Sequence, residues 1–434
     1  MDEGLVAAGP VAERLMVVSS DGHAGAEMDD YREYLDPEHR EAFDRFVVAY
    51  WALAGGRSTD LKTISMKFDD DVVERWKRDY LDRGRLDGYS DPGRRLVEID
   101  GDGVSAELLF PDFAVPFAPF APSVAALSAV GSTPEQLVAG FRAYNRWLVD
   151  FCAAAPERFA GQVAVSFRDP GVAVADIRWA KEHGLVGVVF VMSPDDKLLY
   201  DEAYDPIWST AEELGMPVNF HVGISSGVPS YAGSTQHPAT ARALSGSGVM
   251  DVGHHILSVL IWGGVMERHP RLTFVFTEQH SDWVIAHLAR MDHSYDNGTL
   301  RHYGIRDVCP LRPGEYFERQ CFLGSSIFSR GEIRARHRIG LDKIMLGMDY
   351  PHFEGTWRHE TREYLRATVG AEQVPEAEVR MLLGETLVRV FGLDATKLSP
   401  IAARVGPTYS DLLAPPAPSF EISGDVVRPL VTTG

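Results

Sequence analysis

Short apolar runs rich in Val, Ile and Phe recur along the chain, and amphipathic stretches lie between several of them. Such alternation is typical of a parallel sheet whose strands are covered by helices on both faces. The pattern predicts eight strands, at residues 16–20, 106–110, 161–167, 186–191, 217–221, 272–277, 321–324 and 343–347. It predicts helices between them, among others at residues 133–155, 170–183, 205–214 and 258–268. Eight β/α repeats close a barrel, so the predicted fold class is α/β, a distorted TIM (β/α)8 barrel.

Two long segments depart from this repeat, at about residues 31–95 and about 223–256. The first is charged and aromatic, whereas the second is rich in Gly and Ser. Connections of more than about 15 residues usually carry function or helices of their own. Both follow the C-terminal ends of predicted strands, the face on which barrel enzymes build their active sites. We therefore expect helical insertions that form walls of a substrate pocket.

The barrel domain is predicted to span residues 1–398, insertions included. Residues 399–434 contain three prolines close together and show weak periodicity. This composition fits either a C-terminal tail or an arm that packs on a neighbouring subunit.

Composition and charge narrow the classes of function. The 434 residues are 45% hydrophobic and 24% charged, which is the profile of a globular protein. A net charge of −20 repels phosphate backbones and anionic lipids, so neither nucleic acid nor a membrane is an expected partner. No signal peptide or membrane span is visible, and three cysteines without CxxC spacing indicate a reducing, cytoplasmic location. There is no Walker loop or dinucleotide fingerprint.

Candidate metal ligands lie where three predicted strands end. The segment SSDGHAG places Asp21 and His23 two residues apart, so that in a strand both side chains face the same side. The segment PVNFHVG places His221 at the end of the fifth strand, and LGMDYPH places Asp349 at the end of the eighth. A lone Asp or His at a strand end often caps a turn, so the prediction depends on their joint placement. Together they suit one divalent metal such as zinc, manganese or iron.

Further polar residues lie near the same ends. The segment FVFTEQHSDW adds Glu278 and His280, either of which is a candidate ligand, general acid or base, or orienting partner of a ligand histidine. Of the two, Glu278 is favoured for the pocket. His254, His255 and His352 are candidate substrate contacts. Because neighbouring helical residues point about 100° apart, at most one of His254 and His255 faces the pocket.

The motifs and their order strongly resemble the amidohydrolase-related family, in the branch that includes aminocarboxymuconate semialdehyde decarboxylase and resorcylate-type decarboxylases. The resemblance covers most of residues 16–393. It is carried by DxH, VSAELLFPDF, YNRWLVDFCAAAPERFAGQVAV, YDPIWSTAEELGMPVNFHVG, GGVMERHPRLTFVFTEQHSDWV, MLGMDYPH and EVRMLLGETLVRVFGL. It implies a distorted barrel with one catalytic metal near the C-terminal ends of its strands. By position it implies that the metal ligands are Asp21, His23, His221 and Asp349.

Three positions depart from the family pattern. Asp21 stands where His or Glu is commoner, which keeps the ligand but leaves the preferred metal open. Glu278 occupies the place of a catalytic His in the known decarboxylases, and a carboxylate differs from an imidazole in charge and pKa near neutrality. Thr386 replaces a usual Asn, where we expect a structural effect.

These observations favour a metal-dependent hydrolase of a small amide, ester or lactone. In this reaction a metal-activated water attacks, Asp349 transfers its proton and Glu278 assists. The alternative is a non-oxidative decarboxylase of an aromatic or enal carboxylic acid, in which Asp349 or a nearby acid protonates carbon. A third hypothesis is a catalytically silent metal-binding scaffold. We expect one divalent metal, zinc before manganese or iron, a small-molecule substrate and a homodimer.

Overall fold

The computed structural model describes residues 13–417, except for 55–72, 75, 113, 120–131, 192–197, 225–239, 241–250, 298 and 353–359. It also describes a two-stranded antiparallel pair near the C-terminus, β11 (Ile422–Ser423) and β12 (Val426–Val427).

Eight parallel strands form the centre of the molecule, and each lies on one of the predicted segments. In spatial order they are β1 (Val18–Ser19), β2 (Ala106–Leu109), β5 (Phe159–Ser166), β6 (Gly187–Val191), β7 (Val218–His221), β8 (Phe274–Thr277), β9 (Cys321–Ser326) and β10 (Ile344–Gly347). Neighbours in this order are also neighbours along the chain, as expected for a (β/α)8 barrel. A small antiparallel pair, β3 (Ala114–Val115) and β4 (Ala118–Pro119), follows β2.

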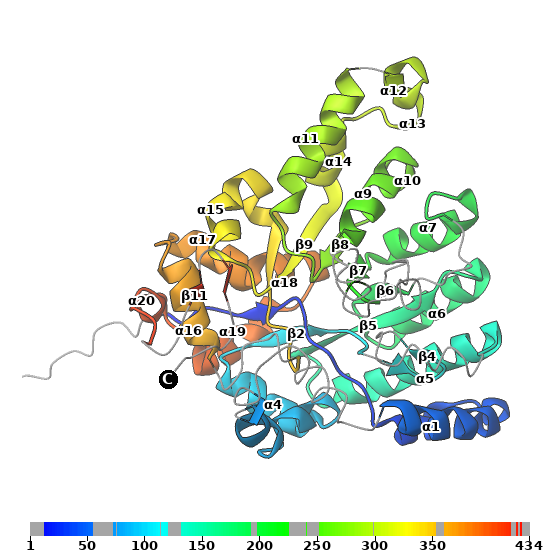
Figure 1. Ribbon diagram of the computed structural model, residues 1–434, viewed down its shortest axis with the longest axis vertical. Helices are drawn as coiled ribbons and strands as arrows, with labels where there is room; N and C mark the ends of the chain where they lie inside the picture. The colour runs from blue at the N-terminus through cyan, green and yellow to red at the C-terminus, as the bar shows by residue number, and fades with distance from the viewer. Residues whose placement is uncertain are drawn as a thin grey trace, which may run out of the picture.

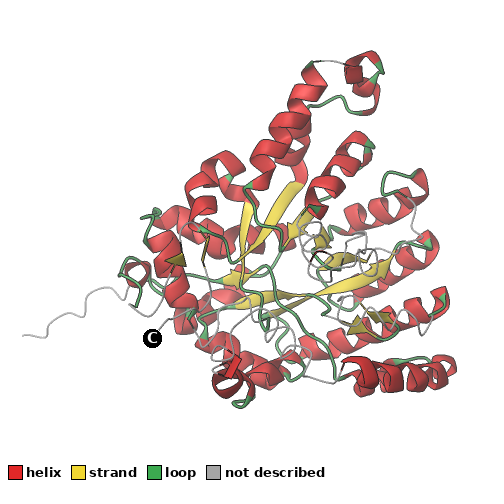
Figure 2. Cartoon of the chain, viewed as in Figure 1, coloured by secondary structure: helices red, strands yellow, loops and turns green. Residues whose placement is uncertain are grey.

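The first and last strands bring the two edges of the sheet together. The Ser20 N–H donates to the Leu346 carbonyl at 2.7 Å, and just beyond the strands the Asp349 N–H donates to the Asp21 carbonyl at 2.9 Å. Helices surround the strands on the outside (Figure 2). The fold is therefore a nearly closed, distorted TIM barrel, and the predicted fold class is confirmed.

The helices between the strands begin and end at residues suited to those positions. Pro92, Pro134 and Pro170 stand at first helical positions, and the side chains of Asp91, Thr133 and Asp169 accept hydrogen bonds from backbone N–H groups of the first turn that follows. These helices are α4 (Pro92–Gly101), α5 (Pro134–Ala153) and α6 (Pro170–Glu182), followed after β6 by η6 (Glu202–Tyr204) and α7 (Asp205–Leu214). None of the described helices is long and apolar enough to cross a membrane.

The helix predicted at 258–268 differs from the structure. It is two helices, α9 (Val252–Trp262) and α10 (Val265–Arg268), separated by Gly263 and Gly264. Gly264 has a φ of 73°, a left-handed conformation that glycine adopts without steric cost and that ends α9 here. The apolar run alone did not show where the helix begins, because α9 starts six residues earlier, inside the second predicted insertion.

Later helices form an extension and then complete the barrel. After β8 the chain forms α11 (Trp283–Asp296), α12 (Thr299–His302), α13 (Ile305–Val308) and α14 (Pro313–Gln320). Of these, α11 and α14 run outward from the barrel with α12 and α13 at their far end (Figure 1). The helices that follow are α15 (Arg330–Ile339), η7 (Leu341–Lys343), α16 (Thr361–Leu365), η9 (Arg366–Gly370), α17 (Glu376–Arg380), η10 (Met381–Glu385) and α18 (Thr386–Phe391).

The first predicted insertion is helical where it is described. It contains η1 (Met28–Tyr34), η2 (Pro37–His39), α1 (Arg40–Ala54), η3 (Lys77–Leu81) and η4 (Arg85–Tyr89). Most of the second predicted insertion, 223–256, lies outside the described residues, apart from its ends. That the two insertions form walls of a substrate pocket stays a prediction.

The C-terminal segment packs on the barrel before it leaves the described region. Helix α19 (Ala395–Val405) runs through the predicted boundary at residues 398 and 399, and α20 (Tyr409–Leu412) follows it. The Leu15 N–H donates to the Pro407 carbonyl at 2.8 Å, and Leu398 and Leu412 are buried in the core. The division into barrel and tail, and a role as an oligomer arm, stay predictions.

Candidate metal centre

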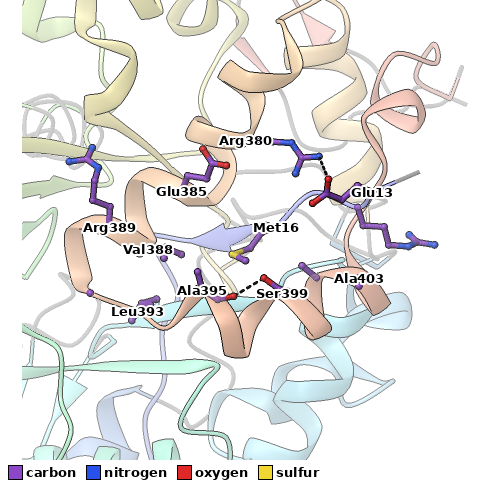
Figure 3. Close-up of a pocket in the computed structure, with 13 residues that line it drawn as sticks. Glu13, Met16, Arg380, Glu385, Val388, Arg389, Leu393, Ala395, Ser399 and Ala403 are labelled. Carbon is purple, nitrogen blue, oxygen red and sulfur yellow. Dashed lines mark hydrogen bonds and ion pairs between the residues drawn. The ribbon is translucent and has the colours of Figure 1, made fainter. Parts of the chain in front are cut away.

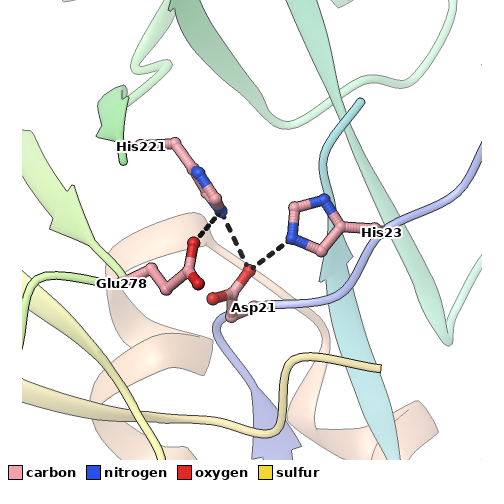
Figure 4. A group of neighbouring side chains, drawn as sticks. All are labelled: Asp21, His23, His221 and Glu278. Atoms are coloured by element: carbon pink, nitrogen blue, oxygen red, sulfur yellow. Dashed lines mark hydrogen bonds and ion pairs between the residues drawn. The ribbon is translucent and has the colours of Figure 1, made fainter. Parts of the chain in front are cut away.

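The ends of β1, β7 and β8 bring four side chains together. Asp21 and His23 follow β1, His221 is the last residue of β7, and Glu278 follows β8. Each offers one ligand atom, and these atoms lie within 4.8 Å of one another. Figure 4 shows the four side chains pointing toward a common centre. The parallel strands explain the meeting, because all their carboxyl ends lie on one face of the barrel.

Hydrogen bonds fix which nitrogen of each histidine faces this centre. His23 Nδ1 lies 2.9 Å from the Pro111 carbonyl, and His221 Nδ1 lies 2.7 Å from the Val222 carbonyl. Because a carbonyl only accepts, each Nδ1 carries the hydrogen in a neutral ring and each Nε2 keeps its lone pair. Both Nε2 atoms face carboxylates: His221 Nε2 lies 3.2 Å from Asp21 Oδ1, and His23 Nε2 lies 3.3 Å from Asp349 Oδ1.

A divalent cation fits this donor set. His23 Nε2 and Asp349 Oδ1 are both buried, and neither has a well-aligned hydrogen bond within the described residues. Lone pairs that face one another in a buried site repel unless a proton or a cation lies between them. Asp21 is held in place because Ser326 donates a hydrogen bond to its second oxygen. Two imidazole nitrogens with carboxylate oxygens are ligands that zinc, manganese and iron all accept.

A second group adjoins the first through His23. It comprises His23, Asp349 and His352, and His352 also contacts Asp112, which follows β2. His352 Nδ1 lies 3.0 Å from Asp349 Oδ1, and His352 Nε2 lies 2.9 Å from Asp112 Oδ1. Burial alone would raise the pKa of Asp349, but His352 and His23 outweigh it and hold that pKa below its usual range. Burial likewise opposes a charge on His352, yet Asp349 and Asp112 raise its pKa well above the ordinary value.

Backbone strain coincides with the polar residues that end β8 and β10. Asp349 has a φ of 57°, Glu278 of 60° and His280 of 57°, all in the left-handed region that side chains other than glycine rarely adopt. The Glu278 N–H donates to the Gly324 carbonyl at 2.9 Å, and the Asp349 N–H donates to the Asp21 carbonyl at 2.9 Å. Such strain persists where the surroundings enforce it, and it concentrates at functional sites.

Glu278 lies at the open side of the cluster. Its side chain is 27% exposed, and Oε2 lies 3.6 Å from His221 Nε2. Asp21 and Asp349, by contrast, are fully buried. Glu278 therefore combines contact with the ligand set and access to solvent.

The other predicted residues lie apart from the cluster. His280 is 51% exposed, and its Nδ1 lies 3.6 Å from the buried Glu332. His254 packs in α9 against the rings of Trp283 and His287, at 4.4 and 5.0 Å. His255 is exposed. As substrate contacts, His254 and His255 remain predictions.

Sequence reasoning missed three residues that support the cluster: Asp112, Ser326 and Arg95. Asp112 and Ser326 stand at the ends of β2 and β9, so attention to every polar residue at a strand end would have found them. Arg95 is fully buried in α4, pairs with Glu107 at 2.6 Å and donates to the His23 carbonyl at 2.6 Å. No local pattern marks it, because its partners come from distant strands.

A cavity of about 890 Å³ lies elsewhere, where β1 begins and α18 and α19 pack (Figure 3). It lies beside Met16, ahead of β1, away from the strand ends that carry the cluster. Its Arg380 already pairs with Glu13 and Glu376, and its Arg389 donates to the Asp342 carbonyl and lies over the Phe322 ring. Barrel enzymes build their sites at the opposite face, so this cavity is not the candidate active site.

Fold and cluster together define the class of this protein as a (β/α)8-barrel enzyme with a polar centre suited to a divalent metal. The family model described as "Amidohydrolase" matches residues 110–393, and the chain belongs to that family.

Three known proteins illustrate the similarity. The decarboxylase orsB of Emericella nidulans is 28% identical over 240 residues, which are 52% of this chain and 68% of that protein. The gamma-resorcylate decarboxylase of Rhodococcus jostii is 27% identical over 277 residues, 58% of this chain and 76% of that protein. The solved 5-carboxyvanillate decarboxylase of Novosphingobium aromaticivorans, complexed with manganese, has a TM-score of 0.60 at 20% identity and shares the fold. That alignment covers 87% of this chain and 96% of the solved one.

Proposed function

We propose that this protein is a metal-dependent, non-oxidative decarboxylase of an aromatic carboxylic acid. The observation that carries the proposal is the buried set of metal-type ligands in a chain whose relatives are named decarboxylases. Hydrolysis was the main expectation from the sequence, and decarboxylation was its alternative. The relatives favour the alternative.

Asp21, His23, His221 and Asp349 would hold one divalent metal. Manganese is the first metal to test, since the solved relative carries it, and zinc, the expectation from sequence, is the second. When bound, the metal supplies positive charge that anchors the carboxylate of the substrate and a neighbouring oxygen.

The residues of the chain provide the proton. Decarboxylation breaks the bond between the ring carbon and the carboxyl carbon, releases carbon dioxide and leaves an electron pair on the ring carbon, which must accept a proton. Asp349 belongs to the ligand set and Glu278 lies at its open side, and either carboxyl group, once protonated, would be placed to deliver that proton. Glu278 can regain a proton from water because it is partly exposed.

Hydrolysis is kept as a second candidate because of Glu278. A carboxylate at the open side of a metal centre suits a base that accepts the proton of an attacking water.

We further propose a small-molecule substrate and a homodimer, located in the cytoplasm, as the sequence predicts.

The test is a substrate panel with the manganese-loaded and zinc-loaded protein. Hydroxylated benzoic acids are compared with lactones, esters and amides, and the reaction is followed in D₂O. The proposal predicts carbon dioxide release and one deuterium at the carbon that lost its carboxyl group. His221→Ala should abolish this, whereas His183→Ala, which alters an exposed histidine directly after α6, should not. Turnover of the esters or amides alone would establish hydrolysis instead.

A further inference from the structure

His352 repeats the hydrogen-bonding pattern of the two histidines in the metal centre. In His23 and His221, one ring nitrogen contacts an oxygen that only accepts, and the other faces a carboxylate. In His352, Nε2 contacts Asp112 Oδ1 at 2.9 Å, and Nδ1 faces Asp349 Oδ1 at 3.0 Å. An ionised Asp112 accepts only, so the hydrogen of a neutral His352 ring lies on Nε2 and the lone pair on Nδ1.

The surroundings of Nδ1 are those of a ligand position. The neighbours of His352 Nδ1 are Asp349 Oδ1 and His23 Nε2. Both of these atoms are buried, and neither has a well-aligned hydrogen bond in the described part of the chain. The rings of His23 and His352 stack at 4.1 Å with an angle of 18°, so both present an edge to the same region. The two carboxylates beside His352 favour a positive charge there, and a divalent cation satisfies this as a proton does.

We propose that His352, oriented by Asp112, is a further ligand of the metal ion that His23 and Asp349 hold. The inference rests on the metal centre in the proposed function. This role explains why Asp112, which follows β2, contacts His352, which follows β10. A carboxylate that accepts a hydrogen bond from a ligand histidine fixes the tautomer and the orientation of that histidine. The role of substrate contact, predicted from the sequence, is the competing assignment.

The experiment measures Mn²⁺ binding to the metal-free protein by EPR of the free ion, and counts coupled imidazole nitrogens by pulsed EPR. His352→Phe keeps a ring that can stack on His23 but removes both nitrogens. We expect affinity to fall at least about 10- to 100-fold and the count of coupled imidazoles to fall from three to two. The matched control is His183→Phe, because His183 also stacks on an aromatic ring, that of Trp179 at 4.3 Å, yet lies on an exposed helix end. Its affinity should equal that of the wild type.

Asp112 provides a second test that keeps His352 in place. Asp112→Ala removes the acceptor of Nε2, so Mn²⁺ affinity should fall about 10-fold or more, whereas Asp112→Asn retains an acceptor oxygen and should cost less. In the His352→Phe background, Asp112→Ala should add less than about 2-fold, since it acts through the missing ring. If His352→Phe does not fold, the single variants Asp112→Ala and Asp112→Asn still test the proposal.

The outcomes separate this inference from the proposed function. If the wild type binds neither Mn²⁺ nor Zn²⁺, the metal centre itself is wrong. If it binds Mn²⁺ but His352→Phe leaves affinity and nitrogen count unchanged, His352 is not a ligand. A raised KM with unchanged metal affinity would assign it to substrate binding instead.

Discussion

Two carboxylate and histidine pairs lie beyond the carboxyl ends of β8, β9 and β10, and they differ in how well their polar atoms are satisfied. In one, Asp349 is buried, His352 is 15% exposed, and Asp349 Oδ1 has no well-aligned hydrogen bond within the described residues. In the other, Glu332 is buried beside the half-exposed His280. Glu332 accepts from the N–H and hydroxyl of Ser281, the hydroxyl of Ser325 and the N–H of Ser329, at 2.6–2.7 Å.

The difference separates a functional pair from a structural one. A buried carboxylate with all its oxygens satisfied stabilises the fold and has little capacity left for a ligand. A buried carboxylate with an unsatisfied oxygen costs stability and retains that capacity. Both pairs lie at left-handed residues, so strain alone does not distinguish them.

Asp349→Asn should have the largest effect on activity. The amide keeps the size of the side chain but removes the charge that binds metal and exchanges the proton, so kcat/KM should fall about 10³- to 10⁴-fold. Steady-state kinetics measures this loss. A loss below about 10-fold in kcat/KM would remove Asp349 from the mechanism.

Glu332→Gln should show the opposite profile. The amide loses the charge that accepts from three serines and His280, so the free energy of unfolding should fall by about 3 kcal/mol. Mn²⁺ affinity should stay within about 3-fold of the wild type. If affinity instead fell with little loss of stability, the comparison between the two pairs would be wrong.

The contribution of Glu332 to stability should also depend on pH in the acid range. His280 and the serine donors outweigh burial and lower the pKa of Glu332 to about 2, below its ordinary 4.5. A group whose pKa is lower in the folded state stabilises the fold above its unfolded pKa. Its contribution, up to about 3 kcal/mol, is therefore lost as the pH falls from about 4.5 toward 2. Urea unfolding across this range should show a shallower loss for Glu332→Gln than for the wild type. Equal slopes would mean that Glu332 does not contribute.

His280→Ala should have the smallest effect. Its side chain is half exposed, so water screens its ion pair with Glu332, and the free energy of unfolding should fall by less than about 1 kcal/mol. The interaction with Glu332 raises the pKa of His280, so this small contribution is complete below its unfolded pKa of about 6.5 and is lost at higher pH. A loss above about 2 kcal/mol, seen in urea unfolding at pH 6, would contradict this assignment.

The sequence predicted the strands and the residues that end them, because both follow from local patterns. The alternation of apolar runs located all eight strands, and parallel strands necessarily bring Asp21, His221 and Asp349 to one face. The partners of these residues were not predictable in this way. Asp112, Ser326 and Arg95 act across the barrel, and only the closed sheet brings them to the side chains that they orient.

The most direct test of the metal centre is elemental analysis of the purified, untagged protein, with metals measured against protein concentration. The account predicts one divalent ion per chain in the wild type and in Glu332→Gln, and its loss in His221→Ala. A wild-type protein that holds no divalent metal and takes up neither manganese nor zinc would contradict it, as would full occupancy in His221→Ala.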